Sequence, residues 1–190
     1  MEKTKLSTGP ICYPMPCSLV GVNVGGKPNY LTVAWFSMVN AKPPYLMIAL
    51  GKAHYTNPGI KENHTFSVNI PSVAMAEITD YCGLVSGKKI SKATLFETFY
   101  GELKTAPMIK GCPYNVECKL VQSVDLPADE LFIGEIIAMY ADEIYLTEGL
   151  PDLRKISPFV LSMSERKYLA LGVEVGKAWE MGKKLIPKGA

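Results

Sequence analysis

The sequence carries no excess of one charge. Its 20 Lys and Arg residues face 18 Asp and Glu residues, which gives a formal net charge of +2. A balance this close to neutral does not indicate a nucleic-acid-binding surface. Hydrophobic residues make up 48% and charged residues 20% of the 190, which is typical of a globular chain long enough to fold without a disulfide or metal. We therefore expect partners to be recognised through a pocket, with no nucleic acid among them.

Long uninterrupted apolar runs are also missing. The longest uncharged stretch, residues 6–26, is broken by three prolines, so it does not form a continuous membrane helix. Lys3 and Lys5 are not followed by the apolar core of a secretory signal. The sequence predicts a soluble, cytoplasmic protein with no membrane association.

The familiar catalytic motifs are absent too. There are two histidines, His54 and His64, and neither lies in an H-E-x-x-H pattern. The sequence has no G-x-S-x-G elbow, no P-loop and no G-x-G-x-x-G fingerprint. No metal is expected and no side chain stands out as catalytic. A Cys–His nucleophile pair stays open, because a reactive thiol depends on neighbours that a sequence does not show.

Cysteine is present in an odd number and without a zinc-binding spacing, which favours reduced thiols buried as small hydrophobic groups. A redox or metal site remains an alternative if folding gathers them. The five are Cys12, Cys17, Cys82, Cys112 and Cys118.

Short alternating runs bounded by turn residues predict a mainly β chain. A strand over 18–24, a turn at Gly25-Gly26 and a strand over 29–39 form a hairpin. Residues 45–50 are nearly all apolar, which predicts a strand buried on both faces. Further strands are expected over 66–70, 116–124, 131–140 and 143–147, with short edge strands at 159–162 and 168–172.

A few short helices interrupt the strands. Asn57 is placed to cap a helix with Pro58 in its first position, and Ser72 is placed to cap a second helix that ends at Gly83 in a left-handed conformation. Residues 92–98 favour one or two further helical turns, and residues 173–190 are a helix candidate. We expect a single domain over residues 1–190, with its core at about 14–172 and a C-terminal tail.

The stretch from Gly51 to Pro58 is the most informative, because a strand ends and a helix begins there. The first N–H groups of a helix attract anions, and Lys52, His54 and Thr56 add hydrogen-bond donors, so the stretch suits a phosphate. An ordinary solvated strand-to-helix loop remains the alternative.

A second stretch, residues 29–37, sets small or polar side chains among bulky ones. Thr32 and Ala34 share a face by the two-residue period of a strand, which leaves room for a planar ligand against the backbone. A half-buried strand of any barrel can alternate in this way, so this pattern alone is not specific.

These stretches, taken in order with several others, resemble the flavin reductase-like, FMN-binding split-barrel family, and most closely its flavoredoxin-type members. The resemblance runs from about Pro14 to Gly172, and the ordered set is specific although no single piece is. The pieces are Pro14-Met15-Pro16, Asn29-x-x-Thr32-x-Ala34-Trp35, Pro43-Pro44, Gly51-Lys52-x-His54-x-Thr56, Phe66-x-Val68-Asn69-x-Pro71, Ser86-Gly87 with Lys92, Glu117-Cys118 and Ile133-Gly134-Glu135.

The resemblance implies a split β-barrel that forms a homodimer and holds FMN non-covalently near the subunit interface. The strand residues Asn29, Thr32, Val33, Ala34, Trp35 and Ser37 would line the ring system and ribityl chain, and Lys52, His54, Tyr55 and Thr56 would take the phosphate. Asn69, Ser86, Gly87, Lys92 and Tyr168 match further family positions around the flavin. Lys92 and backbone N–H groups of residues 29–37 would stabilise the negative charge of the reduced flavin. The alternative is that Lys92 is a solvated surface charge and that the N–H groups only pair strands.

Two departures from the family pattern stand out. Pro127-Ala128-Asp129-Glu130 replaces a Gly-x-His motif before the Ile-Gly-Glu strand, which reshapes the rim where a reductant or partner approaches. Ser91-Lys92 replaces an Asp-Lys pair, so any structural role of that acid is lost.

Flavin chemistry accounts for the lack of an obvious acid, base or nucleophile, because the cofactor carries the reaction. One hypothesis is an oxidoreductase that takes a hydride from NAD(P)H onto FMN and passes electrons to free flavin, a metal complex or a redox protein. The alternative is an electron-carrier module that meets ferredoxin-like proteins and has no nicotinamide site. A haem or another flat ligand is disfavoured, since His54 is assigned to the phosphate and only His64 remains.

Overall fold

The computed structural model describes residues 1–12 and 14–187. Its main body is a seven-stranded antiparallel sheet with the strand order β3-β2-β6-β9-β10-β5-β4. These strands are β2 (Ser18–Val24), β3 (Lys27–Val33), β4 (Phe36–Asn40), β5 (Tyr45–Gly51), β6 (Thr65–Ile70), β9 (Tyr114–Asp125) and β10 (Asp129–Tyr140).

Smaller elements surround this sheet. A three-stranded sheet pairs β1 (Met15–Pro16), β13 (Phe159–Ser162) and β14 (Lys167–Ala170), and two short hairpins pair β7 (Thr98–Phe99) with β8 (Met108–Ile109) and β11 (Leu146–Thr147) with β12 (Leu150–Pro151). The helices are α1 (Thr56–Asn63), α2 (Ala76–Leu84), α3 (Leu153–Ile156) and the 3-10 turns η1 (Val73–Met75), η2 (Glu143–Tyr145) and η3 (Lys183–Leu185).

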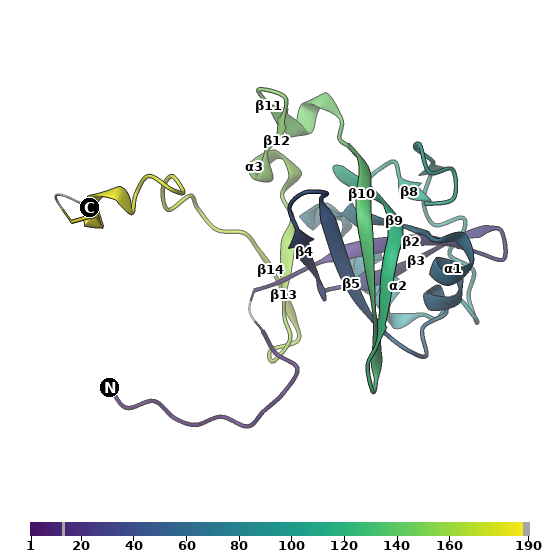
Figure 1. Cartoon of the computed structure of the whole chain (residues 1–190), viewed down its shortest axis with the longest axis horizontal. Coiled ribbons are helices and arrows are strands. Elements are labelled where there is room, and N and C mark those ends of the chain that lie inside the picture. The colour runs from purple at the N-terminus through teal and green to yellow at the C-terminus, as the bar shows by residue number, and fades with distance from the viewer. Residues whose placement is uncertain (13, 188–190) are drawn as a thin grey trace.

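The large sheet twists strongly but does not close on itself. Figure 1 shows β2 and β3 crossing behind β5, β9 and β10 at a steep angle. The space between these two halves holds the larger apolar core, which includes Val20, Ile48, Phe66 and Phe132, each 0% exposed. A smaller core around Leu19, Tyr30 and Cys82 lies where α2 packs against β2 and β3. The expected split β-barrel with a few short helices is therefore the fold observed.

Several predicted strands agree with the structure, because short runs of apolar and β-branched residues and the neighbouring turns define them. β2 and β13 have the expected bounds, and Gly25 and Gly26 take positive φ angles of 57° and 74° in the turn between β2 and β3. The predicted strand over 29–39 is wrong as a single element. It breaks at Ala34-Trp35, since β3 pairs with β2 while β4 pairs with β5 at the far edge of the sheet.

Other expectations need correction. β5 is not buried on both faces, because its burial alternates along the strand. Residues 93–96 form turns and bends, Thr98 begins β7, and 143–147 form η2 and the two-residue strand β11. The tail contains the 3-10 turn η3 in place of a longer helix, and its last three residues, 188–190, lie outside the described residues.

The helix signals were only partly correct. α1 begins at Thr56, with Tyr55 as the preceding residue and no side-chain cap; Asn57 instead donates to the carbonyl of Gly51. Ser72 precedes η1 without a side-chain bond. Gly83 lies inside α2, where a Cβ would contact Thr32 at 3.3 Å, so close packing rather than a left-handed turn explains a glycine there.

Candidate functional site

A tight turn connects β5 to α1. The carbonyl of Gly51 accepts hydrogen bonds from the backbone N–H of His54 at 3.0 Å and from Asn57 Nδ2 at 3.3 Å, which holds the turn closed. Neither a side-chain cap nor an acidic residue occupies the first turn of α1. The partial positive charge of the helix start is thus left for an external anion.

Thr56, the first residue of α1, is joined to β3 by a buried hydrogen bond. Asn29 Nδ2 donates to Thr56 Oγ1 at 3.1 Å, and both residues are buried. The other amide atom, Asn29 Oδ1, is buried without a hydrogen-bond partner. A buried acceptor without a donor is unfavourable, so this atom is suited to a hydroxyl or N–H of a bound molecule.

A cavity of about 220 Å³ opens at this position. Gly87 forms part of its wall, and a Cβ there would collide with Asn29 Oδ1 and approach Tyr55 Cδ1 at 2.5 Å. Only glycine leaves this space open. The cavity brings together seven of the predicted site residues, Asn29, His54, Tyr55, Thr56, Ser86, Gly87 and Lys92.

A second cavity of about 340 Å³ adjoins the first, because both are lined by Leu31, His54 and Gly83. It extends along the end of β3 to the break before β4. The two together fall within the roughly 300–1,000 Å³ typical of small-molecule sites. The second cavity gathers the predicted residues Thr32, Val33, Ala34, Trp35, His54 and Tyr168.

Lys92 is a buried ammonium in the wall of the first cavity, with 2% of its surface exposed. Its Nζ donates to the carbonyls of Tyr30 at 2.8 Å and Cys82 at 2.6 Å. Burial lowers the pKa of Lys92, and the Cys82 thiol partly opposes this. An ammonium has three hydrogens, so one remains for a ligand after both carbonyls are satisfied.

His54 lies where the two cavities meet. Burial and the nearby charge of Lys92 lower its pKa, and Asp129, which also lines the second cavity, acts in the opposite direction. The imidazole therefore favours its neutral form, which keeps one N–H to donate and one nitrogen to accept.

Tyr168 closes the second cavity from β14. Its hydroxyl donates to Asp80 Oδ1 at 2.7 Å, and its ring packs edge-on against Phe159 with centroids 5.3 Å apart. Burial and the Asp80 carboxylate raise the pKa of Tyr168. The ring is thus fixed in place, and its hydroxyl stays protonated.

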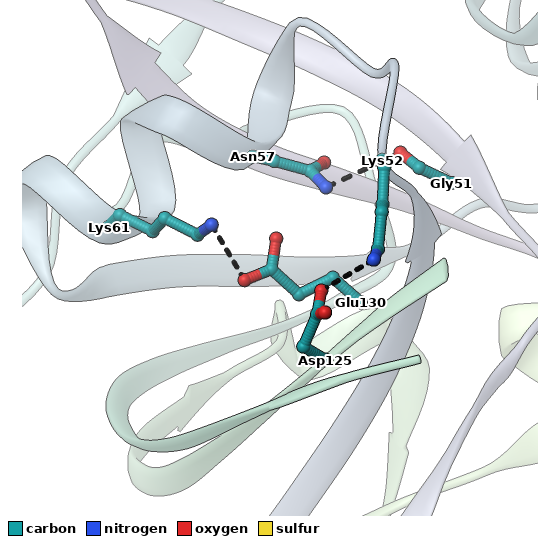
Figure 2. Close-up of polar contacts among 6 residues, drawn as sticks. All are labelled: Gly51, Lys52, Asn57, Lys61, Asp125 and Glu130. Carbon is teal, nitrogen blue, oxygen red and sulfur yellow. Dashed lines mark hydrogen bonds and ion pairs between the residues drawn. The ribbon is translucent and has the colours of Figure 1, made fainter. Parts of the chain in front are cut away.

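Three predicted site residues are not brought into the two cavities. Lys52 Nζ forms an ion pair with Asp125 at 2.7 Å, and Figure 2 shows its side chain directed to the β9–β10 hairpin, below the start of α1. Asn69 is fully buried in the sheet, where it bonds the backbones of Leu19 and Ile109. Ser37 is exposed and lines a neighbouring groove that shares Ala34 and Trp35 with the second cavity.

The structure also adds residues that the sequence did not single out. Cys17, Leu161 and Met163 line the second cavity. Cys17 lies between β1 and β2, whereas Leu161 and Met163 lie in and just after β13, far from β3 in the sequence. Asp129 stands in the stretch expected to reshape the rim, and it does reach the cavity. Of these added residues, only Asp129 had a signal in the sequence, the departure from the family pattern at 127–130. The other three reach the cavity through tertiary contacts that the sequence does not show.

Within the part of the chain that the structure describes, no group of three or more His, Cys, Asp or Glu residues is placed to hold a metal ion. The five cysteines are all free there, and four of them are buried. Among the described helices, none has the length and apolar character needed to cross a membrane.

The fold is an antiparallel split barrel with a cavity at an uncapped helix start, an arrangement typical of β proteins that bind small molecules. The particular family follows from comparison: the chain belongs to the flavin reductase-like family, since the model of the flavin reductase like domain matches residues 11–168. The family resemblance expected from the ordered motifs is confirmed.

Solved structures agree with this assignment. A flavoredoxin from Methanosarcina acetivorans is 49% identical with a TM-score of 0.96, over 98% of this chain and 100% of that one. Flavoredoxin of Desulfovibrio vulgaris (Miyazaki F) is 34% identical with a TM-score of 0.90, over 96% and 100% of the two chains. An NADH-dependent FAD reductase of Streptomyces globisporus is 24% identical over 124 residues, which is 64% of this chain and 68% of the relative.

Proposed function

We propose that the two joined cavities bind FMN, with the phosphate at the start of α1 and the ring system along β3 and the break before β4. The observation that carries this proposal is that two adjoining cavities extend from Thr56 to Trp35, with His54 lining both. It joins an anion-attracting helix start to a largely apolar slot. FMN has the same order of groups, a phosphate, a hydroxylated chain and a flat ring.

The polar atoms of the first cavity fit the phosphate and the sugar chain. Thr56 Oγ1 accepts a hydrogen bond from Asn29, so its own hydrogen is available to a phosphate oxygen. The unpartnered Asn29 Oδ1 would accept from a ribityl hydroxyl. The wall glycine, Gly87, lets the ligand approach this amide closely.

We further propose that the protein is an oxidoreductase of the flavoredoxin type. Bound FMN would supply the redox chemistry, accepting hydride or electrons and releasing them to a flavin, a metal complex or a redox protein. The chain would contribute orientation and charge: Lys92 holds an ammonium against the cavity, and Trp35 and Tyr168 border the slot for the ring. Three predicted residues would contact FMN only if their side chains move, or would affect it only through other residues: Ser37, Lys52 and Asn69.

The electron donor defines two candidate functions. Similarity to an NADH-dependent FAD reductase supports NAD(P)H as the donor. The higher identity to two flavoredoxins supports the alternative, an electron carrier that exchanges with a ferredoxin-like protein and has no nicotinamide site.

Absorbance of the purified protein tests the proposal, first as isolated, then after incubation with FMN, and then after anaerobic addition of NADH or NADPH. A bound flavin spectrum that bleaches with the nicotinamide supports the reductase. A spectrum that persists with NAD(P)H but bleaches with reduced ferredoxin supports the carrier. No binding of FMN would reject the cofactor assignment itself.

We also propose a homodimer, as in the family pattern. Exposed apolar side chains support it on β4, the edge strand of the large sheet, where Met38 is 53% and Val39 is 48% exposed. Light scattering in solution measures the mass, and a monomer at working concentrations would reject the dimer.

A further inference from the structure

The C-terminal arm, residues 173–187, carries large apolar side chains that the body does not cover. Every residue of the arm is exposed, and Val173, Val175, Trp179 and Leu185 expose 90%, 86%, 93% and 78% of their surface. Soluble monomers rarely leave so many apolar side chains in water within one short segment.

The arm has local order of its own. The backbone N–H of Met181 donates to the carbonyl of Lys177 at 3.1 Å, that of Lys183 to Glu180 at 3.0 Å, and η3 follows. At its base, Glu174 lies 3.7 Å from the guanidinium of Arg154 on the body. Figure 1 shows the arm leaving the body beyond β14 and extending away from it. Its turns therefore present apolar groups without contact to their own domain.

The arm is also covered by the match to a solved structure of a relative. The match to the flavoredoxin from Methanosarcina acetivorans covers 98% of this chain at a TM-score of 0.96. The remaining 2% of 190 residues is about four residues, so the match extends into the arm. An arm shared by two chains that are only 49% identical favours a role for its apolar side chains.

A second copy of the chain is the occupant that this geometry favours. Both chain ends leave the body on the side where β4, β13 and β14 lie (Figure 1). That side also presents the exposed apolar residues of β4. Fifteen fully extended residues span up to about 50 Å; the turns shorten this reach, but the arm still extends clear of the body (Figure 1). Two copies that pair through this side by a two-fold axis would exchange their arms reciprocally.

We propose that the C-terminal arm of each chain seats on a second copy, with Trp179 as its main apolar anchor. This exchange rests on the homodimer of the proposed function and goes beyond it, because it assigns the tail a role in holding the two copies together.

The first test compares the dimer dissociation constants of three full-length chains by light scattering and sedimentation: the unchanged protein, Trp179→Ala, and Ile144→Ala. Ile144 is 69% exposed on η2 and lies outside the arm, so it is the matched control. Loss of a seated Trp ring raises the dissociation constant by more than about tenfold, while the control stays near the unchanged protein. Equal constants for all three chains would overturn the proposal.

The second test follows Trp179 directly, since the chain has only two tryptophans, Trp35 and Trp179. The difference between the emission of the unchanged protein and that of Trp179→Phe isolates the arm signal. In the dimer we expect the emission of Trp179 to be blue-shifted and poorly quenched by acrylamide. On dilution to the monomer, the emission should shift to the red, as for a tryptophan in water.

Each contrary result has a distinct meaning. A water-like Trp179 in a dimer overturns the arm exchange and leaves the homodimer intact. A shielded Trp179 in a monomer shows that the arm folds back on its own body, which also overturns the exchange. A full-length chain that is monomeric at every concentration rejects both. FMN binding, measured on the same samples, judges the cofactor assignment separately.

Discussion

Asn29 Nδ2 donates a hydrogen bond to Thr56 Oγ1 at 3.1 Å and so ties β3 to the first residue of α1 across 27 positions of sequence. The bond fixes the direction in which the threonine hydroxyl can donate. Because Asn29 is the donor, the hydroxyl hydrogen of Thr56 is free to point into the cavity beside the helix start.

Replacing Thr56 with Ala removes this donor from the proposed phosphate site. A hydrogen bond to a charged group contributes about 1.5–3 kcal/mol, so we expect FMN affinity to fall roughly ten- to hundredfold. Thr56→Ser keeps the hydroxyl and should retain most of the affinity. Titration of FMN followed by its fluorescence measures both variants. Equal affinities for the Ala and Ser variants would remove Thr56 from the phosphate site.

Lys52 provides a contrasting prediction, because the structure directs it to Asp125. The side chains of Lys52 and Asp125 are 41% and 78% exposed, and exposed pairs of this kind contribute about 0–1 kcal/mol. We expect Lys52→Ala to weaken FMN binding by less than about fivefold and to change the free energy of unfolding little.

Lys61→Ala is the matched control for loss of one positive charge, since Lys61 pairs with Glu130 at 2.7 Å on the same side of the molecule (Figure 2). It should leave FMN affinity unchanged but destabilise the fold more, because the Glu130 side chain is only 9% exposed and loses its partner. If Lys52→Ala instead matches Thr56→Ala in its effect on FMN, then Lys52 leaves Asp125 to take the phosphate.

Lys92→Met tests the buried ammonium. The change leaves the carbonyls of Tyr30 and Cys82 without their donor, which destabilises the fold by about 1–3 kcal/mol for each carbonyl left unpaired. It also removes a positive charge from the cavity wall, so the midpoint potential of bound FMN should become more negative. Urea unfolding and a spectroscopic redox titration measure the two effects. The control is Lys89→Met at an exposed position, which should change neither the free energy of unfolding nor the midpoint potential. An unchanged potential in Lys92→Met would show that the ammonium has only a structural role.

Local sequence patterns were sufficient for much of the fold. β2 follows from a short run of apolar and β-branched residues before a turn, β13 was expected as a short edge strand, and the turn at Gly25-Gly26 follows from the φ angles that glycine permits. The break at Ala34-Trp35 was not predictable in this way. It arises because β3 and β4 pair with different strands, which is a property of the sheet and not of the segment.

The candidate site shows the same division. The start of α1 was identified from the chain itself, and His54 and Thr56 do lie at the cavity. Asn69 carries a motif position but is bonded inside the sheet, and Cys17 lines the cavity although it lies just outside the Pro14-Met15-Pro16 motif. Which partner a polar side chain selects depends on groups that folding brings near, such as Asp125 for Lys52.

The buried thiols predict a loss of stability at alkaline pH. Burial, and then the charge of Glu117, raise the pKa of Cys118 above its ordinary value of 9.0, and burial likewise raises that of Cys112. Below pH 9 both states keep their thiol protons and the stabilisation is complete. As the pH rises above 9, the unfolded chain releases these protons while the folded chain retains them, so the free energy of unfolding falls.

Cys118→Ala should make this fall less steep, by up to about 1.4 kcal/mol per pH unit, because one thiol no longer ionises in the unfolded chain. Urea unfolding at several pH values between 7 and 10.5 gives the slope of the unfolding free energy against pH. The packing lost with the thiol lowers this free energy equally at every pH, so it does not change the slope. Cys12 is exposed, and Cys12→Ala should follow the unchanged protein in parallel. Parallel curves for Cys118→Ala as well would show that this thiol ionises equally in both states, contrary to its complete burial between β9 and its neighbours in the sheet.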